Sequence, residues 1–209
     1  KLDRLQQDDI LVLAGSIPAS LAQTTYERIL ARLEGRGVRA VVDATRDLLV
    51  NVLRYRPFLI KPNNHELSEI TGVKLTTDRE IAAAAKMMQD KGARNVLVSM
   101  AGDGALLLDE QGGVHRIGCP KGKVVNSVGA GDSMVAGFVA GYQQSGGDYE
   151  AALRLCTPRG RAPPLCLGVA TKGGHYKLPK TMGEAGFSEG AKPPPSTHPK
   201  TPIFWGGGL

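Results

Sequence analysis

Short apolar runs alternate with longer segments of helical spacing over most of the chain. Four of these runs predict buried strands, at residues 10–14, 38–42, 58–60 and 95–99. Apolar residues recur with the period of a helix over residues 21–36, 46–55 and 78–91. Strands that alternate with helices are typical of an α/β fold, in which helices cover both faces of a mostly parallel sheet.

Further segments extend this pattern. Asn63 or Asn64 can cap a short helix that ends near Gly72. A hairpin is predicted at residues 105–109 and 114–117. Two more helices are predicted at residues 131–145 and 148–155.

The last part of the chain departs from the pattern. Residues 172–209 hold 6 of the 13 prolines and 8 of the 27 glycines, including a run of three of each. Such runs cannot continue a packed helix or strand, so we expect a tail that is disordered or foreign to the fold. The predicted organisation is a core over residues 1–171, disturbed by prolines at 156–164, followed by this tail.

Cysteine usage and the first residues bear on the compartment. Cys119, Cys156 and Cys166 show no CxxC spacing, which favours reduced thiols over a disulfide framework or a zinc site. The polar start lacks the apolar core of a signal peptide, and no apolar run is long enough to cross a bilayer. We therefore expect a cytoplasmic protein with no membrane partner. Because the chain does not begin with Met, we also expect it to begin inside a longer gene product.

The net charge of +6 raises the question of a nucleic-acid partner. Residues 155–209 carry 7 basic and 2 acidic residues, so nearly all of the excess lies at the end of the chain. The body has no basic stripe interleaved with aromatic residues, which argues against DNA or RNA binding.

Several small and polar residues follow directly after predicted strands. Because ligands bind beyond the carboxyl ends of parallel strands, we expect these residues to form one site. They are Gly15, Ser16, Asp43, Asn63, Ser99 and the loop at Gly129.

The most informative of these segments is Gly129-Ala130-Gly131-Asp132, at the start of a predicted helix. Its small residues let backbone N–H groups approach an anion where the positive end of the helix favours negative charge. A carboxylate beside that anion can accept a proton, which suits phosphoryl transfer to an alcohol. The alternative is a helix start whose small residues only permit close packing.

Two other segments carry candidate chemistry. Residues 99–104 read Ser99-Met100-Ala101-Gly102-Asp103-Gly104, where the glycines either let backbone approach a nucleotide or only form a turn. No Gly-Lys-Ser/Thr follows, which disfavours a P-loop ATPase. In the second segment, Asn63 and Glu66 either order a hydrated Mg²⁺ or simply cap a helix. Lys61 is either a phosphate contact or a solvated charge.

Together these segments resemble the phosphofructokinase B group of the ribokinase-like carbohydrate kinases. The resemblance covers roughly residues 8–155, and residues 125–133, Val-Asn-Ser-Val-Gly-Ala-Gly-Asp-Ser, are similar to the family's second signature. Residues 13–18, 61–67 and 98–105 are most similar to members that phosphorylate fructose 1-phosphate, and next to those that act on tagatose 6-phosphate. The resemblance implies a ribokinase-like three-layer α/β/α sandwich.

The resemblance also implies an activity and a set of roles. ATP with Mg²⁺ would phosphorylate a sugar phosphate, with fructose 1-phosphate preferred and tagatose 6-phosphate or fructose 6-phosphate as alternatives. Asp132 would be the catalytic base, and Gly129, Ala130 and Gly131 the anion hole. ATP would contact residues 99–104, Lys61, Asn63, Gly131 and Asp132. The substrate would contact Gly15, Ser16 and Asp132, and Mg²⁺ would be ordered by Asn63 and, through water, by Glu66.

Two departures from the family pattern qualify this expectation. The family's N-terminal portion is absent from the sequence, including a lid over the sugar that commonly makes the dimer contact. We therefore expect an acceptor pocket open to water, and a family-type homodimer is in doubt. Residues 156–164 replace a family helix and 168–172 resume its turn, which indicates reading-frame errors there and after 172, or else genuine divergence.

Two other functions stay open. A nucleoside or vitamin kinase would share the fold, and a non-catalytic nucleotide-binding fragment would fit the missing portion. For this polypeptide we expect little or no activity.

Overall fold

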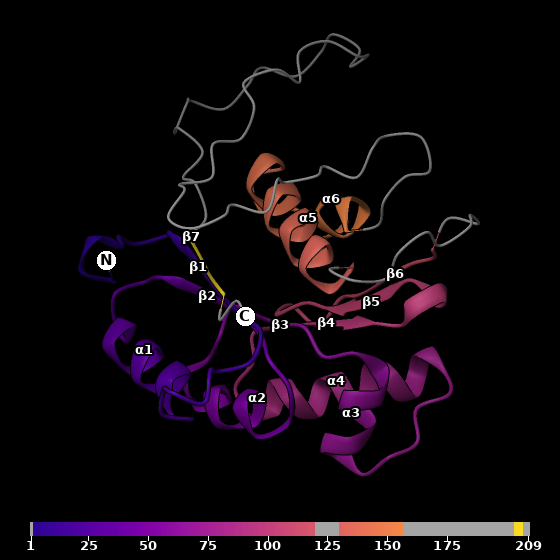
Figure 1. Cartoon of the computed structure of the whole chain (residues 1–209). Coiled ribbons are helices and arrows are strands. Elements are labelled where there is room, and N and C mark those ends of the chain that lie inside the picture. Colours follow the sequence, from indigo (N-terminus) through magenta and orange to yellow (C-terminus); the bar gives the residue numbers. More distant parts are fainter. Residues whose placement is uncertain (1, 120–129, 157–202, 207–209) are drawn as a thin grey trace, which may run out of the picture.

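The computed structural model of the chain describes residues 2–119, 130–156 and 203–206, the last of these as backbone only. Its strands are β1 (Ile10–Ala14), β2 (Arg39–Asp43), β3 (Leu59–Ile60), β4 (Asn95–Ser99), β5 (Ala105–Leu108), β6 (Val114–Ile117) and β7 (Ile203–Gly206). Within the described residues these form one sheet in the order β6-β5-β4-β3-β2-β1-β7 (Figure 1). The pairs from β7 to β4 are parallel, whereas β5 and β6 are antiparallel additions at one edge.

Helices cover both faces of the sheet. One face carries α1 (Thr25–Leu33), α2 (Arg46–Val52), α3 (Asn64–Thr71) and α4 (Asp78–Asp90). The other carries α5 (Ala130–Gln144) and α6 (Tyr149–Leu155), and Figure 1 shows the sheet between the two layers. The predicted three-layer α/β/α arrangement with a mostly parallel sheet is confirmed. No helix in the described part of the chain is both long enough and apolar enough to span a membrane.

Strand β1 shows how the core is divided between the layers. Leu11 and Leu13 belong to the apolar cluster with α1–α4, whereas Ile10 and Val12 belong to the cluster with α5 and α6. Successive side chains of a strand point to opposite faces, and here both faces are buried. This is why the predicted strands read as continuous apolar runs and not as alternating ones.

Two glycines set the distance between α5 and α6. A Cβ on Gly137 would lie 2.2 Å from the Leu155 carbonyl oxygen, and one on Gly141 would lie 2.8 Å from Cα of Ala152. Any side chain at these positions would therefore push the helices apart. The small residues of this helix let α6 pack tightly against it, which fixes α5 over the sheet.

The structure shortens one predicted helix. The prediction covered residues 21–36, whereas α1 begins at Thr25 and ends at Leu33. The Leu21 amide donates to the Pro18 carbonyl, and the Thr25 hydroxyl donates to the Ala22 carbonyl. These bonds form turns before the helix, so apolar spacing there does not produce helical backbone.

The predicted tail contains a strand that the sequence interpretation missed. Residues 203–206 pair in parallel with β1, from Leu11 to Ala14. An unpaired strand edge offers backbone donors and acceptors, and Ile-Phe-Trp is a segment of high strand propensity. The rest of the tail lies outside the described residues, as do residues 157–164 of the segment predicted to be disturbed.

Candidate active site

The carboxyl ends of the parallel strands meet at one edge of the sheet, as predicted. The Gly15 amide donates to the Asp43 carbonyl at 3.0 Å, and the Lys61 amide donates to the Val42 carbonyl at 3.1 Å. Asn63 forms an isolated parallel bridge with Ser99. Residues that follow β1, β2, β3 and β4 are thus brought into one row.

Lys61 is buried at this edge and paired with a carboxylate. Its Nζ lies 3.2 Å from Oδ1 of Asp43, and the residue is only 6% exposed. The alternative of a solvated charge is therefore wrong for Lys61. Burial of an ammonium requires a compensating anion, which the end of β2 supplies.

Helix α5 begins directly at this ion pair. A Cβ on Gly131 would lie 3.2 Å from Nζ of Lys61 and 3.8 Å from Oδ2 of Asp43. The next residue, Asp132, is exposed in the first turn of the helix. Of the predicted anion loop, Gly131 therefore lies at the ion pair, Ala130 is the first residue of α5, and Gly129 lies outside the described residues.

The carboxylates of this edge influence one another. Burial raises the pKa of Asp43, and the neighbouring Lys61 ammonium opposes that shift. The negative charges of Asp132 and Glu66 raise the pKa of Asp43 further. Four charged residues from four different segments therefore share one electrostatic environment.

Asn63 and Glu66 cap α3 reciprocally. The Glu66 amide donates to Oδ1 of Asn63 at 2.8 Å, and the Asn63 amide donates to Oε2 of Glu66 at 2.9 Å. The helix ends at Gly72, which has the left-handed conformation expected of a C-terminal stop. The capping alternative is therefore confirmed, and it leaves the Glu66 carboxylate at the same edge as Asp43.

These residues fit a magnesium ion that is shared with phosphate groups. Among the described residues, no group of three or more His, Cys, Asp and Glu side chains could hold a metal ion by itself. Mg²⁺ commonly retains several waters and takes one or two carboxylates together with substrate phosphates. Glu66 and Asn63 could supply such a sparse set of ligands.

The predicted nucleotide contacts in the turn between β4 and β5 include both buried and exposed residues. Met100 is buried. Gly104 has a φ of 92°, and a Cβ added there would lie 2.0 Å from the Ile117 carbonyl oxygen. Both serve the fold. Ala101, Gly102 and Asp103 form an exposed 3₁₀ turn, and a Cβ on Gly102 would meet open space. The exposed three are the residues of this turn that a nucleotide could contact.

Tyr26 is a site-supporting residue that the sequence interpretation missed. Its hydroxyl donates to the Gly15 carbonyl at 3.0 Å and fixes the exposed Gly15–Ser16 turn after β1. Burial and the nearby charge of Asp43 raise the pKa of Tyr26 to about 12, so the hydroxyl stays protonated. In the sequence Tyr26 fills an apolar position of a helix, and no pattern marks its hydroxyl.

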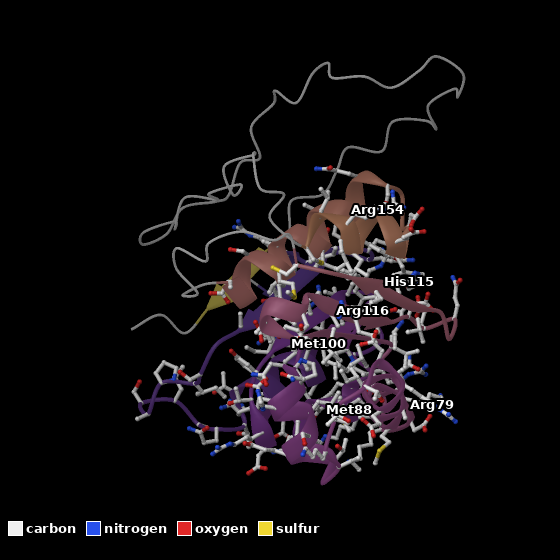
Figure 2. The ribbon with its side chains drawn as sticks, turned by 90° about the vertical axis from the view of Figure 1, so that its right-hand side faces the viewer. Arg79, Met88, Met100, His115, Arg116 and Arg154 are labelled. Carbon is white, nitrogen blue, oxygen red and sulfur yellow. The ribbon has the colours of Figure 1, made fainter. Side chains whose placement is uncertain are left out.

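A cavity of about 410 Å³ lies away from this edge, between β6 and α6. It is lined by His115 and Arg116 of β6 and by Arg154 of α6, among others, and Figure 2 labels these three residues. None of the predicted site residues lines it. His115 is held by Asp109, with 2.7 Å between Nε2 and Oδ2.

The structure is that of an α/β/α protein with a row of charged residues at one edge of its sheet, and sequence comparison identifies the class. The chain belongs to the pfkB family of carbohydrate kinases, whose sequence profile matches residues 1–158.

Individual relatives agree with this assignment. The chain is 47% identical over 168 residues to 1-phosphofructokinase of Bacillus subtilis, covering 80% of this chain and 55% of that protein. It is 32% identical over 185 residues to D-tagatose-1-phosphate kinase of Bacillus licheniformis, covering 88% of this chain and 59% of that protein. The chain thus spans about half the length of the curated relatives that it matches.

A solved structure confirms the fold. Phosphofructokinase-2 of Escherichia coli in complex with fructose-6-phosphate superposes with a TM-score of 0.66 at 28% identity. The match covers 73% of this chain and 50% of the other. The predicted ribokinase-like architecture is thereby confirmed over the matched part.

Proposed function

We propose that this chain is part of an ATP-dependent sugar-phosphate kinase that converts fructose 1-phosphate to fructose 1,6-bisphosphate. The single observation that carries the proposal is the meeting of Lys61, Asp43 and the first turn of α5 at the edge where Asp132 is exposed. Support for the acceptor comes from the 47% identity to a 1-phosphofructokinase.

The phosphate groups of the donor would bind at the start of α5. Backbone N–H groups of the first turn point out of the helix without partners within it, and the helix end carries partial positive charge. Together with Lys61, these groups can bind the charged oxygens of the transferring phosphoryl group. Bound Mg²⁺ would neutralise charge on the donor phosphates.

Asp132 would accept the proton of the attacking sugar hydroxyl. Its carboxylate is exposed in the first turn of α5. If that turn binds the phosphates as proposed, Asp132 would lie beside the reacting oxygen. Proton removal at that oxygen and charge stabilisation at the phosphoryl group are the two tasks of this reaction.

The remaining contacts follow the edge of the sheet. Ser16 and the backbone of Gly15, held by Tyr26, would contact the sugar phosphate on one side. Residues 101–103 would contact ATP on the other. In this proposal the acceptor would lie at the β1 end of the row and ATP at the β4 end.

A substrate panel tests the proposal directly. Formation of ADP would be followed with fructose 1-phosphate, fructose 6-phosphate, tagatose 6-phosphate and tagatose 1-phosphate, and with a nucleoside as the same-fold alternative. We expect the activity of this chain to be low, with fructose 1-phosphate giving the highest kcat/KM of the panel. A preference for any other acceptor, or for a nucleoside, contradicts the proposed substrate.

The second candidate is a nucleotide-binding fragment without turnover, which the coverage of 55% of the B. subtilis relative favours. Binding of MgATP without phosphoryl transfer to any acceptor would support it. In that case the same assay on a chain extended to the length of its relatives shows whether the additional residues confer activity. The cytoplasmic location stays a prediction, and the expected doubt about a family-type homodimer is likewise untested.

A further inference from the structure

The ion pair at the active edge has an unusual position for two charges. Lys61 and Asp43 lie at the ends of neighbouring strands, and their side chains are 8% and 18% exposed. The ammonium of Lys61 also lies beside the first turn of α5, since a Cβ on Gly131 would approach Nζ to 3.2 Å.

This position is electrostatically costly for a lone ammonium. The N-terminal end of a helix carries partial positive charge, which repels a cation placed against it. Burial adds a desolvation cost, which a paired carboxylate offsets. Without a carboxylate at Asp43, the lowest-energy place for the Lys61 ammonium would be solvent, away from α5.

We propose that Asp43 is a positioning residue, whose carboxylate holds the ammonium of Lys61 against the first turn of α5, where it contacts the donor phosphates. The inference rests on the proposed kinase function, because Lys61 is there a phosphate ligand. Asp43 itself is expected to contact neither the donor nor the acceptor.

The geometry distinguishes Asp43 from the other carboxylates of the edge. Asp132 is exposed, and Glu66 is engaged in the cap of α3, whereas Asp43 is the carboxylate that forms the ion pair with Lys61. The backbone of Asp43 is also fixed, because its carbonyl accepts the Gly15 amide. A carboxylate on a fixed strand end can hold a flexible lysine in one place.

The absence of a side chain at Gly131 belongs to the same arrangement. A Cβ at that position would lie 3.5 Å from Cε of Lys61 in addition to its contact with Nζ. A side chain at residue 131 would therefore crowd the ammonium, and Lys61 would have to shift by a few tenths of an ångström. Close backbone approach to an anion and room for Lys61 are two separate demands that this glycine meets.

A double-mutant cycle tests whether Asp43 acts through Lys61. The variants are Asp43→Asn, Lys61→Met and the two combined, with Asp47→Asn as a control, because Asp47 is an exposed carboxylate in the first turn of α2. The readouts are the Kd of the magnesium complex of AMP-PNP and, separately, kcat and KM for MgATP. Thermal unfolding shows that each variant is folded, and the double variant leaves neither charge uncompensated.

The expected result is coupling between the two substitutions. Asp43→Asn should weaken AMP-PNP binding by about 10-fold alone and by less than about 2-fold in the Lys61→Met background, as for contacting residues that share one role. Asp47→Asn should leave Kd unchanged. An equal loss in both backgrounds would overturn the inference, because Asp43 would then act independently of Lys61.

The two readouts separate this inference from the proposed function. Coupling in Kd together with no phosphoryl transfer by the wild-type chain would sustain the positioning role and refute the kinase activity of this chain. Phosphoryl transfer without coupling in Kd would sustain the kinase activity and refute the positioning role. No binding of AMP-PNP by the wild-type chain would overturn the positioning role, because Lys61 would have no phosphate to contact.

Discussion

Asn63 and Glu66 hold each other through two backbone-to-side-chain hydrogen bonds of 2.8 and 2.9 Å at the start of α3. The carboxylate that caps the helix also contributes its charge to the edge where Asp43 lies. One side chain therefore serves both local folding and the electrostatics of the site, and the two roles can be separated by substitution.

Glu66→Gln should preserve the cap and remove the charge. Glutamine also completes a capping box, so the free energy of unfolding should change by less than about 0.5 kcal/mol. The Mg²⁺ concentration for half-maximal activity should rise about 10-fold or more, as is usual when a group that orders metal-bound water is lost.

Glu69→Gln on the same helix is the matched control for this substitution, since Glu69 is exposed and its ion pair with Arg46 has an N–O distance of 3.5 Å. Denaturant unfolding and Mg²⁺ titration of activity give the two quantities. An unchanged Mg²⁺ requirement in Glu66→Gln would restrict Glu66 to capping.

The two glycines of the β4–β5 turn should respond in opposite ways to alanine. Gly104→Ala should destabilise the protein by about 2 kcal/mol or more, because of its positive φ and the collision with the Ile117 carbonyl. Gly102→Ala should change stability by less than about 0.5 kcal/mol, because the alanine Cβ would meet open space. The Gly102→Ala substitution should instead raise the KM for MgATP. An unaltered KM would remove Gly102 from the nucleotide site.

Tyr26→Phe should loosen the turn on the substrate side. The Gly15 carbonyl loses its hydroxyl donor, which costs about 1 kcal/mol of stability. We expect KM for fructose 1-phosphate to rise more than KM for MgATP. Tyr55→Phe is the control, because that hydroxyl interacts with Arg54 at an exposed position. Equal changes in both KM values would indicate a general loss of structure.

The cap of α4 should make stability depend on pH in acid. Glu80 accepts hydrogen bonds from the amides of Thr76 and Thr77 and from the Thr76 hydroxyl, and the backbone bond of Thr76 is the largest cause that lowers its pKa to about 2. Because the folded pKa lies below the usual 4.5, this contribution is present above about pH 4.5 and is lost as pH falls toward 2. Melting temperatures across that interval should fall less steeply in Glu80→Gln, and an identical slope would contradict this assignment.

Elements with strong local signals were predictable from sequence. Asn63, followed three residues later by Glu66 and then by Gly72, marks the start and end of α3, and the structure has both at these residues. The buried strands were predictable for the same kind of reason, since apolar runs on both faces need no information from distant residues.

The arrangement within the site was less predictable, because it depends on residues from different segments. The burial of Lys61 depends on Asp43 at the end of a neighbouring strand and on α5, which follows much later in the chain. A lysine before a proline carries no local signal of such a partner. The role of the Tyr26 hydroxyl is hidden in the same way, because the helix that carries it is predicted from its apolar side alone.

The central claim is that Asp132 removes a proton from a sugar hydroxyl while phosphate binds at the start of α5. The most direct measurement is phosphoryl transfer from MgATP to fructose 1-phosphate by wild type and Asp132→Asn, with AMP-PNP affinity measured on the same samples. We predict that kcat falls by about a hundredfold or more while Kd for AMP-PNP changes by less than about threefold. A near-normal kcat in Asp132→Asn, with wild type active, would contradict the account.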